Sequence, residues 1–374
     1  MPIYKMDGKK DGKQKYRVRI NYIDSSGKPK QIDRVAYGSD EAKTLERCLI
    51  EEIKKTPPTT AITIKKLYDE YTAYKKLEVR ASSLDKTKRI LERYVLAYYN
   101  NFKLNKLTPQ ELRKWKNKIS EFGLSITTSQ NIYGEFRALL NYAVKCEYLI
   151  KNPLQNVGNF KDAYSVPEHD KIQYYTADQF KKYINYAKSC IKTLSDYDYY
   201  VFFSIAYYTG MRKGEINALK WSDIENDILH VRRSINQKLK GNEDVETPPK
   251  NKTSYRSLQM PFPLIKILDE HKERQKVIES FSDDFRICGG IRCLRDSSLD
   301  KKNQAFAKGA GLPHIRIHDF RHSHASLLAN EGINIQEIAR RLGHSKIEIT
   351  WNTYAHLYPR EEERAVKILN GIIT

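Results

Sequence analysis

Apolar residues recur at every second position near the start of the chain. Between residues 16 and 22, Tyr, Val, Ile and Tyr alternate with Arg, Arg and Asn, which is the period of a strand with one buried face. A Ser-Ser-Gly-Lys turn follows, and residues 31–37 can return antiparallel. Ser39, followed by two acidic residues, can begin a helix that runs to about residue 55. Residues 1–57 are therefore predicted to form a small β-sheet backed by one helix.

The apolar spacing changes to three and four between residues 61 and 155. Leu67, Tyr71 and Tyr74 follow this period, which is typical of an amphipathic helix. Thr108 is a helix-start signal, because proline fills the first helical position after it and glutamate the third. Prolines at 57 and 58 separate this part from the first one. We predict a bundle of about four helices over residues 61–160.

After residue 170, helical patterns surround a short β section. Thr176 and Gln179 form a capping-box pattern, and residues 228–235 and 255–260 can pair as strands. Gly210, Gly332 and Gly343 stand where helices end in the left-handed conformation. Helices are predicted at 177–192, 196–209, 213–219, 262–280, 299–309, 318–331, 335–342, 346–358 and 361–370. The chain is thus expected to be a multidomain, mainly α protein whose last domain, residues 170–374, is mixed α+β.

Composition narrows the class of protein. Hydrophobic residues make up 40% of the 374, so a packed core is available and wholesale disorder is excluded. The longest uncharged apolar run, residues 199–211, is shorter than the about 20 residues that span a bilayer. No apolar secretory segment follows the first methionine, and the five cysteines are odd in number and scattered. We expect a cytoplasmic protein with no membrane partner.

Charge points to a polyanionic partner. Lys and Arg number 66 against 46 Asp and Glu, a net charge of +20. Residues 1–57 carry +5, residues 61–165 carry +9 and the remainder carries +6, so the excess is densest on the helical part. Nucleic acid is the favoured partner, although solvated basic faces would give the same composition. The candidate DNA contacts are Arg17 and Arg19 on the polar strand face, with Lys86, Lys88, Arg89 and Lys114 on the helices.

A first candidate for chemistry lies in Thr-Gly-Met-Arg-Lys-Gly-Glu, residues 209–215. One helix ends at Gly210 and another begins, which places Arg212 at the junction. A guanidinium near a helix N-terminus can bind two phosphate oxygens while backbone N–H groups point the same way. Glu215, three residues on, could orient Arg212. An ordinary surface arginine is the alternative for this stretch alone.

The stretch His-Asp-Phe-Arg-His-Ser, residues 318–323, allows two interpretations. His318 and Arg321 share a helix face and would combine a proton carrier with a phosphate clamp. His318 and His322 also have the i, i+4 spacing of the zinc motif H-E-x-x-H, but Asp319 replaces its glutamate. Arg321 would place a cation beside such a metal, which argues against it. A purely structural role for these histidines is a third interpretation.

A third stretch, Leu-Gly-His-Ser, covers residues 342–345. His344 follows the helix-ending Gly343, and Tyr354 lies ten residues later within a predicted helix. The chain has 26 tyrosines, so a single tyrosine is most often a packing residue. Tyr358, one helical turn after Tyr354, is a second tyrosine on the same face.

Taken together, the three stretches resemble the tyrosine recombinase (integrase) family of phages and conjugative transposons, related in its active site to type IB topoisomerases. The resemblance in motif covers residues 203–358. Residues 61–160 look like the family's core-site DNA-binding domain. Residues 1–57 look like the arm-type DNA-binding sheet of phage and conjugative-element integrases.

The resemblance implies a role for each residue. Tyr354 matches the nucleophile, which attacks a DNA phosphodiester and leaves a 3′-phosphotyrosine with a free 5′-hydroxyl. Arg212 and Arg321 match the two arginines that bind the non-bridging phosphate oxygens. His318 matches the general base, and His344 a phosphate hydrogen-bond donor. Glu215 matches an acidic residue that braces the site.

The family's proton donor to the leaving 5′-oxygen is a lysine in a β-turn. Lys250 is the match, with Lys252 two residues away as the alternative. A covalent phosphotyrosine conserves bond energy, and the sequence holds no Walker-type phosphate-binding motif, so we expect no cofactor and no metal. The implied function is site-specific integration and excision of a mobile element.

The implied partners are double-stranded DNA with core-type and arm-type sites, three further copies of the chain in a homo-tetramer, and possible excision or host factors. The last residues, 360–374, carry an apolar stripe that could pack on a neighbouring copy or within their own domain. The expected location is the bacterial cytoplasm, at the nucleoid. Two other functions remain: a DNA-binding protein without catalysis, and a metallohydrolase using His318 and His322.

Overall fold

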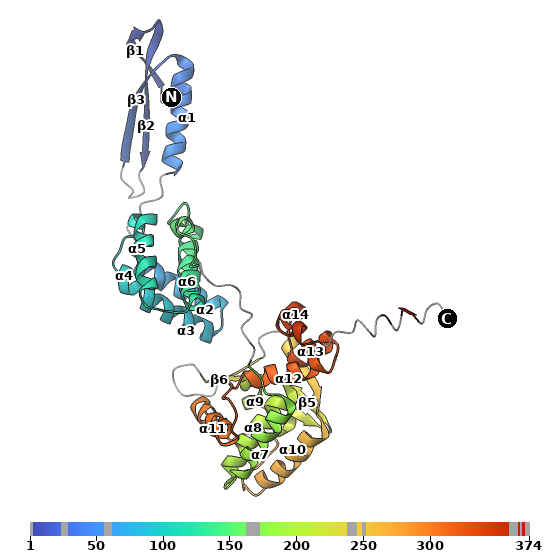
Figure 1. Ribbon diagram of the computed structural model, residues 1–374. Helices are drawn as coiled ribbons and strands as arrows, with labels where there is room; N and C mark the ends of the chain where they lie inside the picture. Colours follow the sequence, from blue (N-terminus) through green and yellow to red (C-terminus); the bar gives the residue numbers. More distant parts are fainter. Residues whose placement is uncertain are drawn as a thin grey trace. The chain divides into compact units, whose positions relative to one another are not determined.

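The computed structural model describes residues 3–23, 29–55, 62–161, 173–237, 245–248 and 252–358, with 366 and 369–370. The chain divides into two compact units, Met1–Val166 and Pro167–Thr374. Figure 1 shows strands only at the start of the first unit and in the middle of the second, with helices elsewhere. Over the described residues no helix is both long and apolar enough to cross a membrane.

The first unit begins with an antiparallel sheet in the order β1 (Ile3–Lys10), β2 (Lys13–Ile23), β3 (Pro29–Tyr37). Helix α1 (Ser39–Lys55) covers one face, where Val18, Ala36, Ala42 and Leu49 form a small core. The predicted strands and helix are present, but the apolar pattern does not predict β1. Its residues do not alternate, and the pairing with β2 shifts register between Lys5 and Lys9.

The rest of the first unit is helical and has its own core. Its helices are α2 (Ile64–Glu78), α3 (Ala81–Leu91), α4 (Ala97–Tyr99), α5 (Pro109–Ser120) and α6 (Ile126–Lys145), with a π-helical turn at Glu92–Leu96. Trp115 and Phe136 pack edge to face in that core, and the Trp115 indole donates to the Tyr94 carbonyl at 2.7 Å. The Thr108 hydroxyl accepts from the Glu111 backbone, as the start signal predicts.

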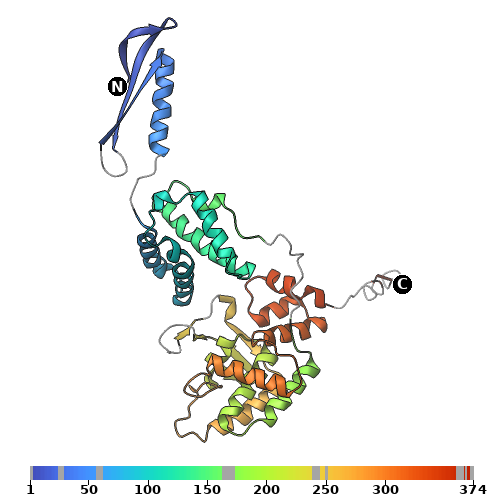
Figure 2. The ribbon, with the colours of Figure 1, turned by 60° about the vertical axis from the view of Figure 1, so that its left-hand side comes forward.

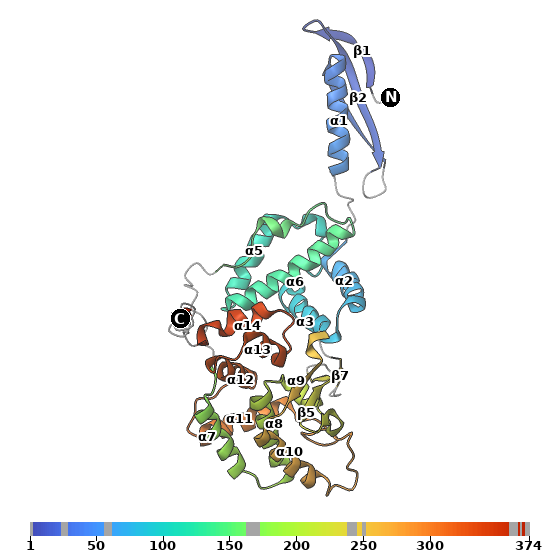
Figure 3. The same cartoon turned by 90° about the vertical axis from the view of Figure 1, so that its right-hand side faces the viewer.

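The second unit is built around one helix that is buried on every side from Tyr200 to Tyr207. Helix α8 (Leu194–Thr209) packs against α7 (Ala177–Ser189), α10 (Phe262–Gln275) and α12 (Asp319–Asn330). Val201, Phe202 and Phe203 are consecutive and fully buried, which requires neighbours all around the helix. Figure 3 shows α7, α8 and α10 side by side in this unit. The remaining helices are α9 (Lys213–Ala218), α11 (Asp296–Gly309), α13 (Ile335–Leu342) and α14 (Ile347–Tyr354).

The strand predicted at 228–235 is wrong as a single element. It splits into β5 (Ile228–Val231), which pairs with β4 (Ile224–Glu225) and β8 (Arg256–Gln259), and β6 (Ser234–Asn236), which pairs with β7 (Val245–Thr247). The chain leaves the first sheet between them, at Arg232 and Arg233, and Arg233 pairs with the buried Asp223 carboxylate at 3.0 Å. Ile235 then joins a separate cluster with Ala218 and Cys293.

Several helix ends also differ from prediction. Helices α7, α10 and α14 end at Ser189, Gln275 and Tyr354, and a 3-10 turn, Ala355–Leu357, follows α14. Gly210 and Gly343 adopt φ of 64° and 67° and end α8 and α13 as predicted. The predicted helix 361–370 lies almost wholly outside the described residues. Helices α12, α13 and α14 gather at one end of the unit, coloured red to orange in Figure 2.

Candidate active site

Four helix ends supply the candidate catalytic residues. Arg212 is the N-cap of α9 and His318 the N-cap of α12, one turn before Arg321. His344 follows the end of α13, and Tyr354 is the last residue of α14. Side chains at helix ends project from fixed backbone positions, so packing of the helices brings the four segments together.

Arg321 links two of these segments directly. Its side chain is buried, with Nη1 donating to the Gly210 carbonyl at 2.8 Å and Nη2 to the Leu342 carbonyl at 2.6 Å. Both acceptors are at helix C-terminal ends, where carbonyl groups lack partners within the helix. Burial, with the neighbouring Arg212 guanidinium, lowers the pKa of Arg321 to about 9. The side chain therefore remains a cation at neutral pH.

Glu215 holds two arginines. One carboxylate oxygen accepts from Arg212 Nη1 at 3.0 Å, and the other accepts from Arg256 Nη2 at 2.8 Å. The Arg212 backbone N–H also donates to Glu215 at 3.0 Å. Burial alone would raise the pKa of Glu215, but the Arg256 and Arg212 guanidiniums lower it below its ordinary value. Glu215 is thus a buried anion that fixes the partly exposed Arg212.

The two candidate histidines are both held neutral. One side of His318 is open to solvent, but partial burial of its ring, with His322 and Arg321 nearby, lowers the pKa of His318 to about 4. Burial and the Arg321 and Arg212 cations lower the pKa of His344 to about 4. His344 Nδ1 lies 2.8 Å from the Thr350 hydroxyl, which fixes the ring against α14.

Tyr354 is buried and has a specific partner. Its side chain is 1% exposed and packs with Ala325, Ile338 and Leu342. Its hydroxyl oxygen lies 2.6 Å from Nδ1 of His322. Burial raises the pKa of Tyr354 to about 12, although Arg321 acts in the opposite direction. The group is therefore a neutral phenol in this state.

The two candidate lysines are placed only in part. Lys250 lies outside the described residues, between β7 and β8. Lys252 begins a 3-10 turn, Lys252–Ser254, that leads into β8. Because β8 starts at Arg256, this turn is attached to the residue that binds Glu215.

Two known protein families match segments of the chain. Residues 173–361, more than half of the chain, match the phage integrase family, and residues 63–120 match the N-terminal SAM-like domain of phage integrases. The chain belongs to the phage integrase family. It is therefore a site-specific recombinase, an enzyme that cuts and rejoins DNA, and the predicted family, fold class and activity are confirmed.

Individual relatives are similar along most of the recombinase. The ICEBs1 integrase of Bacillus subtilis is 26% identical over 97% of this chain and 98% of its own. A XerC-like tyrosine recombinase of Caldanaerobacter subterraneus is 30% identical over 70% of each chain. A Tn1549 transposon integrase, solved with a circular intermediate DNA, has a TM-score of 0.66 at 18% identity and covers 84% of this chain and 100% of that one.

Two residues of the site have no signal of this role in the sequence. An arginine in a short strand, such as Arg256, is normally solvent-exposed, whereas here its side chain is 3% exposed. The spacing of His322 suggests only a zinc ligand, yet this histidine contacts Tyr354. Among the residues that the structure describes, no group of three or more His, Cys, Asp or Glu side chains could hold a metal ion.

The candidate DNA contacts lie on both parts of the first unit. Arg17 and Arg19 share the Asp33 carboxylate on the sheet face opposite α1. Lys86 and Arg89 line a pocket of about 590 Å³ on α3, and the exposed Lys114 pairs with Glu111 at 2.7 Å. Lys88 is half-buried on α3.

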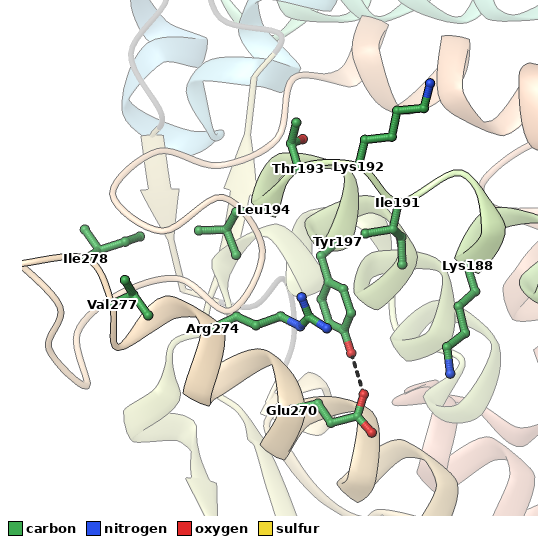
Figure 4. Close-up of a pocket in the computed structure, with 10 residues that line it drawn as sticks. All are labelled: Lys188, Ile191, Lys192, Thr193, Leu194, Tyr197, Glu270, Arg274, Val277 and Ile278. Atoms are coloured by element: carbon green, nitrogen blue, oxygen red, sulfur yellow. Dashed lines mark hydrogen bonds between the residues drawn. The ribbon is translucent and has the colours of Figure 1, made fainter.

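Another pocket of the recombinase contains none of the candidate catalytic residues. It has a volume of about 660 Å³ and lies between α7, α8 and α10. Figure 4 shows Tyr197 and Glu270 joined across it by a 3.0 Å hydrogen bond, with Arg274 beside the tyrosine ring. Those interactions join side chains of α8 and α10.

Proposed function

We propose that the recombinase cleaves one DNA strand by attack of Tyr354 on a phosphodiester. The bond between phosphorus and the 5′-oxygen breaks as the bond between phosphorus and the tyrosine oxygen forms, which leaves a 3′-phosphotyrosine and, after protonation of the 5′-oxygen, a free 5′-hydroxyl. Attack by a second 5′-hydroxyl reverses this step on a new partner strand and releases the tyrosine. The observation that carries the proposal is the pair of bonds from Arg321 to Gly210 and Leu342, which joins the segments bearing Arg212 and His344.

The phosphate is bound by fixed cations. Arg212 and Arg321 suit this role because guanidinium remains charged and carries several N–H groups. Each terminal nitrogen of Arg321 gives one N–H to a carbonyl and has a second for the phosphate. His344 donates a further hydrogen bond to the phosphate. Lys250, or Lys252 in its place, gives its proton to the departing 5′-oxygen.

The phenol must lose its proton as it attacks. His318 is the proposed acceptor, and its low pKa keeps it unprotonated at neutral pH. Its ring centroid lies 5.3 Å from that of His322, which holds the Tyr354 hydroxyl. Tyr354 therefore moves from His322 toward the phosphate when DNA binds.

The proposed substrate is double-stranded DNA carrying two kinds of site. The helical part, residues 61–160, binds the core site beside the cleaved phosphate through basic residues such as Lys86, Lys88, Arg89 and Lys114. The sheet of residues 1–57 binds arm-type sites through Arg17 and Arg19. The names of the relatives ICEBs1 integrase and Tn916 transposase support integration and excision of a conjugative element.

Four copies of the chain are proposed to act on two DNA duplexes. Residues 360–374 would pack on a neighbouring copy, and excision or host factors would set the direction. The proposed location of the complex is the nucleoid, where its DNA substrate lies. A variant that ends at residue 359 tests this proposal in a synapsis assay. We expect it to cleave DNA but not to form the tetramer.

A suicide-substrate assay tests the chemistry. A nicked duplex with the element's own attachment site is incubated with enzyme and EDTA, and covalent adducts are counted on a denaturing gel. We expect an adduct from the wild type and from Tyr358→Phe. In the wild type, the Tyr358 hydroxyl donates to the Ile333 carbonyl. Tyr354→Phe should bind the DNA and form none. An adduct from that variant would remove Tyr354 as nucleophile, and a need for added metal would favour the metallohydrolase.

A further inference from the structure

Arg256 is a buried cation beneath the candidate active site. Arg256 is 9% exposed, whereas its chain neighbour Tyr255 is 51% exposed. Burying a guanidinium is unfavourable unless its N–H groups find acceptors. The position of those acceptors therefore shows what the residue does.

Each of three nitrogens donates to a different segment. Nη2 bonds to the Glu215 carboxylate at 2.8 Å, Nε to the Arg341 carbonyl at 2.7 Å and Nη1 to the Ser254 carbonyl at 3.1 Å. Glu215 holds Arg212, and Arg341 precedes His344 by three residues. Ser254 closes the turn that begins at Lys252.

Packing around Arg256 leaves little room for these segments to shift. A Cβ atom added to Gly343 would lie 3.1 Å from Arg256 Nη1 and 3.1 Å from the Thr253 carbonyl. The turn before His344 thus packs directly on the guanidinium and on the 3-10 turn Lys252–Ser254, which we call the lysine-bearing turn. A pocket of about 460 Å³ lies beside this contact, lined by Arg256, Gly343, His344 and Ile347 among others.

We propose that Arg256 is a positioning residue for strand cleavage. It sets Arg212, His344 and the lysine-bearing turn at fixed distances from one another and makes no phosphate contact itself. The inference rests on the proposed function, because it assigns the purpose of Arg256 through those residues. Misplacing catalytic groups by about 1 Å lowers rates on the order of 100-fold.

The test compares Arg256→Lys and Arg256→Ala with a matched arginine. Arg233 pairs with the buried Asp223 carboxylate in the same unit but bonds to none of the candidate catalytic residues. Single-turnover cleavage of the nicked substrate, core-site affinity and Tm are measured for each variant. Arg256→Lys should cleave about 100-fold more slowly with affinity changed less than twofold, while Arg233→Lys should match the wild type.

Rescue separates positioning from general stability. Guanidinium ion at low millimolar concentration should enter the space left in Arg256→Ala and restore at least a tenth of the lost rate, while equal NaCl should not. Cleavage by Arg256→Lys at the wild-type rate overturns the proposal. A DNA affinity that falls in parallel with the cleavage rate, without restoration of the rate by guanidinium ion, also overturns it. So does unfolding of both variants at assay temperature. An adduct from Tyr354→Phe would instead reject the proposed function.

Discussion

The hydroxyl oxygen of Tyr354 lies 2.6 Å from Nδ1 of His322, within a small core formed by α12, α13 and α14. A tyrosine that is 1% exposed is not available to a DNA phosphate. With Tyr354 as the proposed nucleophile, the described conformation corresponds to a resting state, and the proposal requires DNA binding to release the hydroxyl from His322.

Removing that hydrogen bond should change the resting state. In His322→Phe, the Tyr354 hydroxyl has no partner in its apolar site, which costs on the order of 1–3 kcal/mol. We expect a lower Tm and faster modification of Tyr354 by tetranitromethane in the absence of DNA. Equal modification of Tyr354 in both proteins would show that His322 does not hold it. Both proteins carry Tyr358→Phe, so that modification of this neighbouring tyrosine does not add to the modification measured at Tyr354.

Glu215 should be needed for stability as well as cleavage. Its carboxylate is the shared anion between Arg212 and the buried Arg256, so Glu215→Gln leaves a buried cation without its counter-charge. Breaking a buried ion pair in this way costs about 3–5 kcal/mol. Urea denaturation measures the free energy of unfolding. The control is Asp284→Asn, because the Asp284 carboxylate that pairs with Lys220 is 81% exposed. This variant should change the free energy of unfolding by less than about 1 kcal/mol.

Acid should destabilise the second unit through His324. Burial, with the Arg341 cation, lowers the pKa of His324 to about 3, whereas an unfolded histidine titrates near 6.5. Below pH 6.5 the unfolded chain therefore binds the additional proton, and the free energy of unfolding falls by up to about 1.4 kcal/mol per pH unit. Tm measured from pH 7.5 to 5 should fall less steeply in His324→Asn. An unchanged slope in that variant would exclude His324 as a source of the pH dependence.

Two glycines should respond oppositely to alanine. A Cβ on Gly214 would lie 2.6 Å from the Ile235 carbonyl oxygen, so β6 must move away from α9. We expect Gly214→Ala to lower Tm and slow cleavage, because β6 and β7 lead into the lysine-bearing turn. Gly134 lies within α6 with nothing near its Cβ position, and Gly134→Ala should stabilise by about 0.5–1 kcal/mol. A stabilised, fully active Gly214→Ala would contradict this expectation.

Salt dependence tests the helical DNA surface. A basic side chain that neutralises one phosphate contributes about 0.9 to the steepness of log affinity against log salt. The triple variant Lys86→Ala, Lys88→Ala, Arg89→Ala should therefore lower that slope by roughly 2–3 for core-site DNA. Binding is measured by fluorescence anisotropy between low and physiological salt. An unaltered slope would mean that these residues face solvent in the complex.

Local signals in the sequence predict local structure well. Thr108 and the Thr176–Gln179 capping box start helices, and Gly210 and Gly343 end them, because each of these depends on a few adjacent residues. β1 could not be predicted, since its residues lack the alternation of a half-buried strand.

At the candidate active site, contacts between residues far apart in the sequence limit what the sequence can predict. The motifs predict which side chains are important, but the partner of Glu215 in β8 lies 41 residues away and that of Tyr354 in α12 lies 32 residues away. No spacing rule reaches so far. A buried arginine also looks like a surface arginine in the sequence, because burial depends on what packs over β8.

Both acceptors of the Arg321 guanidinium belong to the main chain rather than to side chains. Every amino acid supplies a carbonyl oxygen, so an apolar, helix-compatible residue of similar size at the buried Leu342 leaves the acceptor in place. The arginine thus depends less on the chemistry of the residue it contacts than on where two helices stop. A mutational scan should find tolerance of conservative apolar changes at Leu342, and intolerance to insertion or deletion at the ends of α8 and α13.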